Sequence, residues 1–240
     1  MGEIGIIGSG NIGSAVALRA SGVGYGVIMA NARGPASLGE RAAAYGAVPG
    51  TVEQAAAARD FVLIAIPEGA VADLPAGLFE RTPAGAAVLD AGNYYPVLRD
   101  APIAEIDAGM PDSMWVASRI GRPVLKMFNT IHAPTIVNGG RPRGAPRRIC
   151  LPIAGDDAEA VHRAIAFADA LGFDGLDAGP LAESWRQQPG TPAYCRDLDL
   201  PTMRDALAEA QHALITAYRR QAMDKARRMA AAAAVPRLSL

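Results

Sequence analysis

The chain has 240 residues, half of them hydrophobic and a fifth charged, and its formal net charge is −1. This composition supplies enough apolar side chain for a sizeable core and excludes wholesale disorder. The near-neutral charge argues against a general affinity for nucleic acid or anionic membranes, and no stretch approaches the ~20 apolar residues of a membrane span. We therefore expect neither a nucleic-acid partner nor a membrane.

The cysteines and the first residues are those expected of a cytoplasmic protein. Cys150 and Cys195 form no CxxC pair and no disulfide framework, which favours two reduced thiols. The opening MGEIGIIGSG lacks the basic segment of a signal peptide, and Ile6 stands where N-myristoylation requires Ser or Thr. No two histidines or cysteines have the spacing of metal ligands. We expect a cytoplasmic protein without a metal site.

In the first half of the chain, short apolar runs alternate with helical stretches. The helices are expected over about residues 11–21, 38–46, 52–58 and 71–79. The apolar runs are EIGII at 3–7, GYGVIMA at 24–30, FVLIAI at 61–66, AAVLDA at 86–91, MWVAS at 114–118 and PVLKMF at 123–128. Uniformly apolar strands that alternate with helices indicate a parallel sheet covered on both faces. The sequence therefore predicts an α/β fold with a doubly wound, mostly parallel sheet.

The second half continues this layering. The segment RRICLPIAG at 147–155 predicts a strand, and Asp156 or Asp157 then supplies the N-cap of a helix. FDGLDAG at 173–179 closes another strand-helix-strand unit. We accordingly predict that residues 1–180 form one α/β domain.

Beyond residue 180 the pattern changes. Residues 181–199 predict a structured loop, and Pro201 is expected to open one long helix. Its apolar residues recur at three- and four-residue steps and form a single stripe: Met203, Leu207, Ala210, Leu214, Ala217 and Tyr218. We predict that segment 181–240 is a loop plus a C-terminal helix, which packs on the main domain or forms a homodimer.

Residues 8–13 read GSGNIG, a GxGxxG motif that directly follows an apolar strand and opens a helix. In that context Gly8 permits the tight turn, Gly10 lets a pyrophosphate approach the backbone, and Gly13 lets the helix pack closely against the strand. The free N–H groups of Asn11 and Ile12 then point at the phosphates, helped by the helix dipole. We predict a dinucleotide site here, the alternative being a Gly-rich turn without a ligand.

The end of the second strand carries no acidic residue. An Asp or Glu about 20 residues past the glycines binds the ribose hydroxyls of NAD, whereas an arginine accommodates the extra phosphate of NADP. Here Asn31 and Arg33 stand 23 and 25 residues beyond Gly8. Arg33 can make a bidentate, charge-assisted contact, and the Asn31 amide and the Ser37 hydroxyl add hydrogen bonds. The sequence therefore favours NADP over NAD, against the alternative of a solvated loop arginine.

The other strand ends carry candidate contacts for the rest of a bound nucleotide and for its substrate. Ligands of open α/β sheets lie beyond the carboxyl ends of the strands, where Pro67, Asn93 and Asn129 stand. Two amides suit the carboxamide of nicotinamide and a polar acceptor, although each asparagine is equally typical of a turn. His132 is a candidate proton donor because imidazole titrates near neutrality, and a structural role is the alternative.

Five strings, in this order, resemble a known family: GSGNIGSA, NARGPASL, DAGNYYPVLRD, KMFNTI and GPLAESWRQQPGTPAY. They are similar to predicted dinucleotide-binding proteins grouped with the coenzyme F-420-dependent NADP oxidoreductases, and more distantly to the cytoplasmic domain of the six-transmembrane metalloreductases. The resemblance extends from Gly5 to about Tyr194. It implies a Rossmann-like domain that binds NADP(H) and exchanges hydride directly with a second cofactor. In the best-characterised branch that cofactor is F-420, and the transfer needs no side-chain acid or base.

The resemblance also carries nucleotide contacts over to particular residues. They are Ser9, Asn11 and Ile12 for the phosphates, Asn31, Arg33 and Ser37 for the adenosine phosphate, and Asn93 and Asn129 for the nicotinamide. Two residues depart from the family pattern. Ala32 replaces the usual serine, and Met127 replaces a small alanine.

The leading hypothesis is an NADP(H)-dependent oxidoreductase whose acceptor is F-420, a flavin, or a small carbonyl or imine compound. Asn129, His132 and Trp185 are the candidate residues of the substrate pocket. A second hypothesis is a sensor or interaction protein that binds NADPH without turnover. A dehydrogenase of hydroxy acids would need a well-placed lysine or histidine on a C-terminal helix, whereas the Arg and Lys residues of the final helix lie near its far end.

Overall fold

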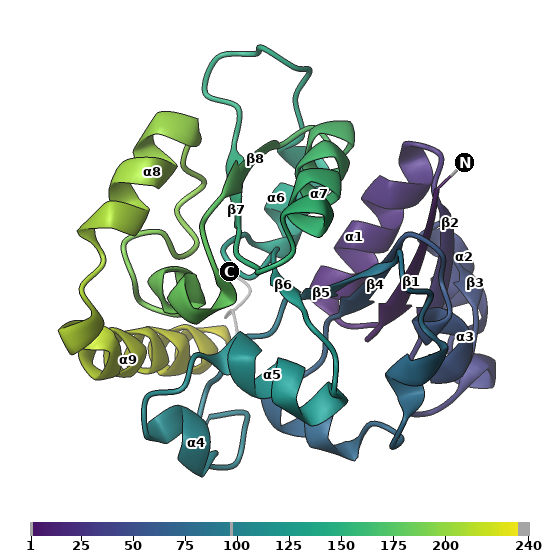
Figure 1. Cartoon of the computed structure of the whole chain (residues 1–240), viewed down its shortest axis with the longest axis horizontal. Helices are drawn as coiled ribbons and strands as arrows, with labels where there is room; N and C mark the ends of the chain where they lie inside the picture. The colour runs from purple at the N-terminus through teal and green to yellow at the C-terminus, as the bar shows by residue number, and fades with distance from the viewer. Residues whose placement is uncertain (1, 97, 235–240) are drawn as a thin grey trace, which may run out of the picture.

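The computed structural model describes residues 2–96 and 98–234. Its main element is a six-stranded sheet of order β3-β2-β1-β4-β5-β6 (Figure 1). The strands are β1 (Glu3–Ile7), β2 (Gly26–Ala30), β3 (Val48–Pro49), β4 (Phe61–Ile64), β5 (Ala87–Asp90) and β6 (Leu125–Lys126). Neighbouring strands are all parallel, so their carboxyl ends share one edge. This arrangement confirms the predicted α/β class and the Rossmann-like sheet.

Helices cover both faces of this sheet because its strands are apolar on both sides. In β4, Phe61 and Leu63 face one core, and Val62 and Ile64 face the other. The first core is covered by α1 (Asn11–Gly22), α2 (Gly39–Ala44) and α6 (Ala133–Asn138). The second is covered by α3 (Val52–Ala56), α5 (Asp112–Ile120) and the 3-10 turns η2 (Glu68–Asp73) and η3 (Leu78–Arg81). Two short elements, η1 (Pro35–Ser37) and α4 (Ala104–Asp107), lie in connecting segments.

A second, two-stranded parallel sheet pairs β7 (Cys150–Ile153) with β8 (Asp174–Asp177), which α7 (Ala158–Ala170) connects. Asp157 caps α7, because its side chain accepts hydrogen bonds from the N–H groups of Glu159 and Ala160. An antiparallel bridge between Lys126 and Ala154 joins this sheet to β6. The predicted strand-helix-strand unit is thus present, although it forms a sheet of its own.

The single long helix predicted from Pro201 is wrong. The segment forms α8 (Leu200–Glu209), the 3-10 turn η5 (His212–Leu214) and α9 (Ile215–Ala234). Ala210 leaves the helical conformation with ψ 132°. The Arg186 guanidinium donates hydrogen bonds to the carbonyls of Leu207 and Ala210, which satisfies the end of α8. The first half of the predicted apolar stripe therefore packs on the second sheet, whereas Leu214 is 41% exposed.

Two other expectations about secondary structure differ from the structure. The run MWVAS belongs to helix α5, with Trp115 and Val116 buried and Met114 exposed. The segment 71–79 forms parts of η2 and η3 rather than one helix. A short apolar run fits the buried face of a helix as well as a strand, so periodicity alone does not separate the two.

The residues beyond 180 are joined to the main sheet. The 3-10 helix η4 (Leu181–Gln187) places Leu181 in the second core, and the Gln187 side chain donates to the Lys126 carbonyl over 3.2 Å. A boundary at residue 180 and a homodimer stay predictions for this single chain, and residues 235–240 of the expected tail lie outside the described residues. Within the described ranges no helix is long and apolar enough to cross a membrane.

Candidate functional site

The glycine-rich turn has the backbone that its sequence predicts. Gly8 adopts φ 124°, a conformation that side-chain-bearing residues rarely take, and a Cβ at Gly13 would lie 2.0 Å from the Gly8 carbonyl oxygen. A Cβ at Gly10, by contrast, would meet no atom within 4 Å. Helix α1 begins at Asn11 without a side-chain cap or an acidic residue in its first turn. Its first N–H groups are therefore free to bind an anion in the open space over Gly10.

The end of β2 is tied to this turn by hydrogen bonds. The Asn31 side-chain N–H donates to the Ser9 hydroxyl over 3.3 Å. The Asn31 Oδ1 atom accepts from the Arg33 backbone N–H at 2.9 Å and from the Ser37 hydroxyl at 3.1 Å. The structure thus brings Ser9, Asn31, Arg33 and Ser37 together at one point. The Arg33 side chain is exposed, and no ion pair to it occurs among the described residues.

These residues fit the phosphate-bearing end of NADP. The open space over Gly10 suits a pyrophosphate, and the exposed guanidinium of Arg33 suits a further phosphate beside it. Asn31 holds the backbone of the loop against the turn through its hydrogen bonds to Ser9 and to the Arg33 N–H. No carboxylate of the ribose-binding kind occupies this loop.

Asn93 and Asn129 follow β5 and β6 and hydrogen-bond to each other. The Asn93 amide donates to the Asn129 carbonyl at 3.1 Å, and the Asn129 amide donates to Asn93 Oδ1 at 3.2 Å. Asn129 also donates to the Gln187 carbonyl and accepts from Gln187 Nε2 at 3.1 Å. Because Asn129 is only 2% exposed and both of its N–H groups are used, it positions Asn93 and the loop after η4. Asn93 itself is half-buried.

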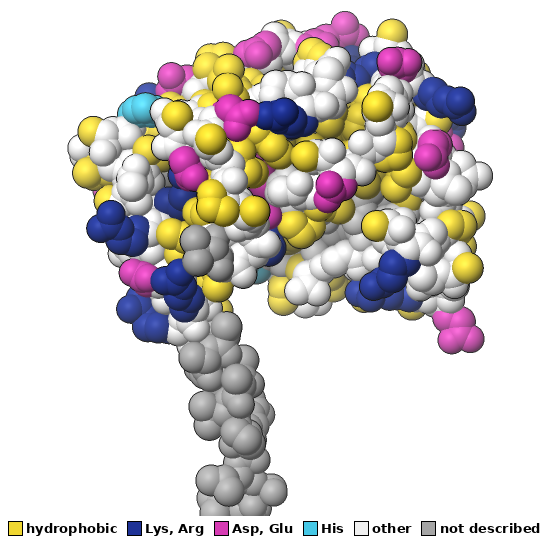
Figure 2. All heavy atoms as spheres, turned by 90° about the horizontal axis from the view of Figure 1, so that it is seen from below, with side chains coloured by type: hydrophobic (Ala, Val, Ile, Leu, Met, Phe, Trp, Pro, Cys, Tyr) yellow, Lys and Arg dark blue, Asp and Glu magenta, His cyan; other side chains and the backbone are white. Residues whose placement is uncertain are grey.

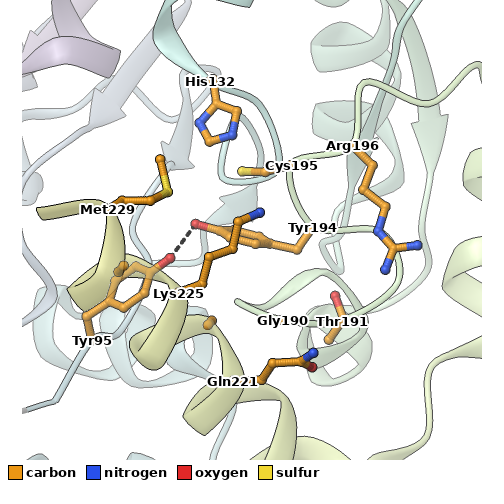
Figure 3. Close-up of a pocket in the computed structure, with 12 residues that line it drawn as sticks. Tyr95, His132, Gly190, Thr191, Tyr194, Cys195, Arg196, Gln221, Lys225 and Met229 are labelled. Atoms are coloured by element: carbon orange, nitrogen blue, oxygen red, sulfur yellow. Dashed lines mark hydrogen bonds between the residues drawn. The ribbon is translucent and has the colours of Figure 1, made fainter. Parts of the chain in front are cut away.

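His132 lines a cavity of about 330 Å³ at the same edge of the sheet (Figure 3). The other lining residues come from three segments: Tyr95; Gly190, Thr191, Tyr194, Cys195 and Arg196; and Gln221, Ala222, Lys225, Ala226 and Met229 of α9. The hydroxyls of Tyr95 and Tyr194 lie 2.7 Å apart. Burial raises the pKa of both phenols, so both are protonated near neutral pH.

The cavity contains a lysine, Lys225, which differs from the expectation for the final helix. The sequence places the cations of the final helix near its far end, which argues against a lysine in the site. The break between α8 and α9 redirects the last helix, and Lys225 then lies among the lining residues of the cavity. In Figure 3 its side chain extends toward Tyr194 and Cys195.

Trp185 and Pro67 lie outside this cavity. The Trp185 ring is 6% exposed, packs edge-on against the His212 imidazole at 5.0 Å, and lies under the Arg186 guanidinium. It therefore belongs to the packing between η4 and the α8–α9 connection rather than to the lining described here. Pro67 lies three residues beyond the end of β4 and immediately precedes η2.

Sequence reasoning missed a buried ionic cluster beneath the carboxyl ends of β4, β5 and β6. The Lys126 ammonium lies 2.8 Å from Asp112 Oδ1 and 3.7 Å from Asp90 Oδ2, and all three side chains are inaccessible to solvent or nearly so. Ser113 Oγ donates to Asp90 and accepts from Lys126. Glu68 is fully buried beside them, and neither of its carboxyl oxygens has a hydrogen-bond partner. A lysine and an aspartate inside otherwise apolar strands are the signal that could have revealed the cluster.

The cluster shifts the protonation of its members. Burial raises the pKa of the Glu68 carboxyl well above its ordinary value, and the charges of Asp90 and Asp112 raise it further. Burial alone would lower the pKa of Lys126, but Asp112, Asp90 and Glu68 raise it by more. Lys126 is thus charged at neutral pH, and burial favours the protonated form of Glu68, which would reduce the number of charges held out of water. Among the described residues, no group of His, Cys, Asp or Glu has the arrangement of a metal site.

Residues 3–94 match the model of the family described as NADP oxidoreductase, coenzyme F420-dependent. The match confirms the predicted resemblance. It spans the glycine-rich turn, the β2 loop and Asn93, so it covers the candidate nucleotide-binding residues up to Asn93. The cavity residues after Tyr94 lie beyond it.

The chain is also similar to individual proteins and solved structures. The Escherichia coli (strain K12) protein YjhV is 40% identical over 79 residues, which are 32% of this chain and 58% of that protein. This chain therefore matches little more than half the length of that relative. The structure of the hypothetical protein SMa0349 from Sinorhizobium meliloti has a TM-score of 0.70 at 29% identity, covering 83% of this chain and 96% of that one.

More distant structures share the fold. A proposed F420-dependent NADP reductase from Arthrobacter sp. FB24 has a TM-score of 0.59 at 18% identity and covers 77% of this chain and 87% of its own. An imine reductase from Myxococcus stipitatus in complex with NADP+ has a TM-score of 0.53 at 20% identity, with coverages of 76% and 56%. At such identities the likeness shows the Rossmann-like fold alone.

Proposed function

We propose that the protein is an NADP(H)-dependent oxidoreductase that exchanges hydride between the nicotinamide and a second molecule. The observation that carries this proposal is the joining of Ser9, Asn31, Arg33 and Ser37 beside the open space over Gly10. An uncompensated arginine at the end of β2 favours the extra phosphate of NADP, whereas an acid there would repel it. The family description and the NADP-linked names of two structural neighbours support the same cofactor.

The residues that would hold the rest of the nucleotide follow from the strand order. Asn93 follows β5, which lies two positions from β1 in the sheet, so it stands roughly 10 Å along the edge from the glycine-rich turn. Its amide suits the carboxamide of the nicotinamide, and Asn129 and Gln187 hold it in place. Pro67 borders the same edge from the intervening strand β4. When bound, the reduced nicotinamide supplies a hydride, which these residues orient rather than activate.

The second molecule would occupy the cavity lined by His132, Tyr95 and Tyr194. Tyr95 lies two residues beyond Asn93, and His132 lies three residues beyond Asn129, so the cavity adjoins the proposed nicotinamide position. F-420, a flavin, and a small carbonyl or imine compound are the three acceptor classes that the proposal includes. The family description supports F-420 as the acceptor. The imine reductase from Myxococcus stipitatus shares the fold, which supports a small imine compound as an acceptor.

Two measurements test the proposal. Titration of the protein with NADPH and with NADH, followed by nucleotide fluorescence, should give clearly tighter binding of NADPH. NADPH oxidation should then be followed under anaerobic conditions with F-420, FMN, FAD, quinones, 2-oxo acids, aldehydes and cyclic imines. Oxidation with any of these supports an enzyme. Tight, saturable NADPH binding without oxidation by the whole panel would instead favour a sensor or interaction protein that binds the nucleotide without turnover.

We also propose a homodimer, because α9 leaves much of its surface uncovered in the single chain. Leu214 and Met229 at the two ends of this region are 41% and 61% exposed. A second copy packed along α9 would cover them. Light scattering at micromolar concentration should give twice the monomer mass, and a monomer mass would contradict the proposal.

A further inference from the structure

The cavity beside the proposed nicotinamide position is cationic, although the whole chain carries a net charge of −1. Its lining includes Lys225, Arg196 and His132 and, within the described part of the chain, no Asp or Glu. Lys225 makes no ion pair with any described residue, so its ammonium is available to a ligand. Figure 2 shows Lys and Arg side chains gathered on the side of the molecule where α9 lies. An anionic group is the natural counterpart of such a lining.

The chain contains only two lysines, and their surroundings are opposite. Lys126 is fully buried and held by two aspartates, whereas Lys225 is exposed at the wall of the cavity. All other basic side chains except the three histidines are arginines. Lys225 therefore provides a compact point charge that can be studied separately from every other cation of the protein.

The two tyrosines provide a neutral proton donor in the same cavity. Each hydroxyl carries one proton, and the 2.7 Å contact between Tyr95 and Tyr194 uses only one of the two. When Tyr194 donates to Tyr95, the Tyr95 O–H group is left to donate to a third atom, whereas Tyr194 also has the Cys195 thiol as a hydrogen-bond partner. Thr191 cannot take this role, because its hydroxyl donates to the Gln188 carbonyl at 2.9 Å. The cavity thus presents an ammonium and a phenol as donors to an acceptor-rich ligand.

We propose that this cavity binds a compact carbonyl or imine compound that carries a carboxylate, which pairs with Lys225, while the Tyr95–Tyr194 hydroxyl pair donates to the C=O or C=N group. The inference rests on the proposed function and names the substrate class of that site. A volume of about 330 Å³ is near the lower limit for small-molecule sites, which favours a compact ligand over a tricyclic deazaflavin with its long side chain.

The proposed reduction is balanced by the groups present. The acceptor carbon gains a hydride from the reduced nicotinamide and forms a C–H bond, and the π electron pair of the C=O bond moves to oxygen. That oxygen takes the proton of the free hydroxyl, so the product is an alcohol. The tyrosine pair, now one proton short, regains it from water at the mouth of the cavity. For an imine, nitrogen takes the proton and the product is an amine.

A binding experiment with matched probes tests the charge recognition. Phenylpyruvate and its neutral methyl ester are titrated into the NADPH-free and the NADP+-loaded protein by calorimetry. The wild type should bind the acid at least ten-fold more tightly than the ester in the NADP+-loaded form. Lys225→Met should bind the two equally, whereas Arg220→Met, an exposed change on the same helix outside the cavity, should keep the preference. Equal binding of acid and ester by the wild type, or an unchanged preference in Lys225→Met, would overturn the inference.

Chemical modification gives a second readout that does not depend on turnover. Because Lys126 is buried, an N-hydroxysuccinimide ester should acetylate Lys225 as the main lysine, and mass spectrometry follows the rate. Phenylpyruvate should slow this acetylation several-fold, and the methyl ester should not. Acetylation at the same rate with and without phenylpyruvate would contradict the ion pair.

The tyrosine pair is tested by removing one hydroxyl at a time. Tyr95→Phe and Tyr194→Phe should each bind phenylpyruvate within about three-fold of the wild type, yet reduce its turnover by roughly 10²–10⁴-fold, as loss of a general acid does. Their NADPH dissociation constants should not change. Turnover at the wild-type rate in both variants would show that the tyrosine pair is not the proton donor.

The same experiments distinguish failure of the substrate class from failure of the proposed function. If the wild type binds no NADPH at all, the proposed oxidoreductase function is wrong. If it binds NADPH and reduces only neutral acceptors, only the proposed carboxylate-bearing substrate is wrong.

Discussion

The side-chain amide of Asn31 donates to the Ser9 hydroxyl over 3.3 Å, so the end of β2 and the glycine-rich turn are held as one unit. Twenty-two residues separate them in sequence, yet the parallel pairing of β1 with β2 brings their carboxyl ends together. The same asparagine accepts from the Arg33 backbone N–H, which fixes the direction in which the arginine leaves the strand. The proposed phosphate site at the turn and the proposed phosphate selection by Arg33 therefore share one scaffold.

Arg33→Ala should remove the preference for NADPH. A charge-assisted hydrogen bond contributes about 1.5–3 kcal/mol, so the NADPH dissociation constant should rise roughly 10- to 100-fold. The NADH dissociation constant should change little, because the adenosine ribose of NADH has no extra phosphate. Fluorescence titration of both nucleotides gives the two constants, with Arg81→Ala, an exposed arginine outside the turn and the β2 loop, as the matched control. An unchanged ratio of the two constants would show that Arg33 does not select the phosphate.

Gly10→Ala should weaken NADPH binding without lowering stability, whereas Gly13→Ala should lower the stability of the fold. A methyl group at Gly10 meets no protein atom within 4 Å, so the melting temperature should stay within a few degrees while NADPH affinity falls roughly 100-fold, about 2.7 kcal/mol. A methyl group at Gly13 would lie 2.0 Å from the Gly8 carbonyl, so this variant should unfold at a clearly lower temperature. Calorimetric melting and nucleotide titration separate the two cases. Normal NADPH binding by Gly10→Ala would place the phosphates elsewhere.

The fold of the candidate nucleotide-binding part was predictable from the sequence because its signals are local. The segment from Glu3 to Arg33 predicts a strand, a turn, a helix and a second strand, and each of these forms as predicted. The residues of the cavity were not predictable in the same way. Lys225 lies in α9, which a break after α8 separates from the helix predicted at Pro201, and the carbonyl of Ala210 at that break accepts from Arg186, a residue far away in the chain. Trp185, by contrast, carried a plausible chemistry but is buried in packing.

The buried ionic cluster shows a different limit of sequence reasoning. Asp90 and Lys126 stand at the ends of two apolar strands, where a polar residue is expected to face a ligand. The pairing of Lys126 with Asp112 depends on the first turn of α5, a segment whose apolar run fits a strand as well as a helix. Strand register therefore predicted where these residues stand but not which partner they meet.

Lys126→Met should strongly destabilise the fold. The variant leaves Asp112 and Asp90 buried without their counter-charge, and breaking such a pair costs about 3–5 kcal/mol of unfolding free energy. Urea denaturation followed by circular dichroism measures the loss. Lys225→Met, the same change at the exposed lysine, should alter the stability by no more than about 0.5 kcal/mol. Equal stabilities of the two variants would mean that the cluster contributes nothing to folding.

Adding Asp112→Asn to Lys126→Met tests the cause of that loss. The double variant removes one of the two stranded carboxylates together with the lysine, so it should be more stable than Lys126→Met alone. A further loss of stability in the double variant would indicate that shape rather than charge holds the cluster together.

Glu68→Gln should change how stability depends on pH. The Glu68 carboxyl is fully buried without a hydrogen-bond partner, and burial together with Asp90 and Asp112 raises its pKa in the folded protein. A raised folded pKa contributes stability that is fully present below the unfolded value of about 4.3 and is lost as pH rises through the folded pKa. Glutamine cannot ionise, so the unfolding free energy of the variant does not have this dependence on pH. The unfolding free energy of the wild type, relative to Glu68→Gln, should therefore fall as the pH rises from about 4.3 toward the raised folded pKa, by up to about 1.4 kcal/mol per pH unit.

Urea denaturation of both proteins at several pH values in that range measures this difference directly. Glu209→Gln, an exposed glutamate at the end of α8, is the control, and its difference from the wild type should not vary with pH. Parallel stability curves for the wild type and Glu68→Gln would mean that Glu68 ionises in the folded protein as readily as in the unfolded chain. That outcome would require the buried Glu68 carboxylate to be stabilised by Lys126, which is already paired with Asp112 and Asp90.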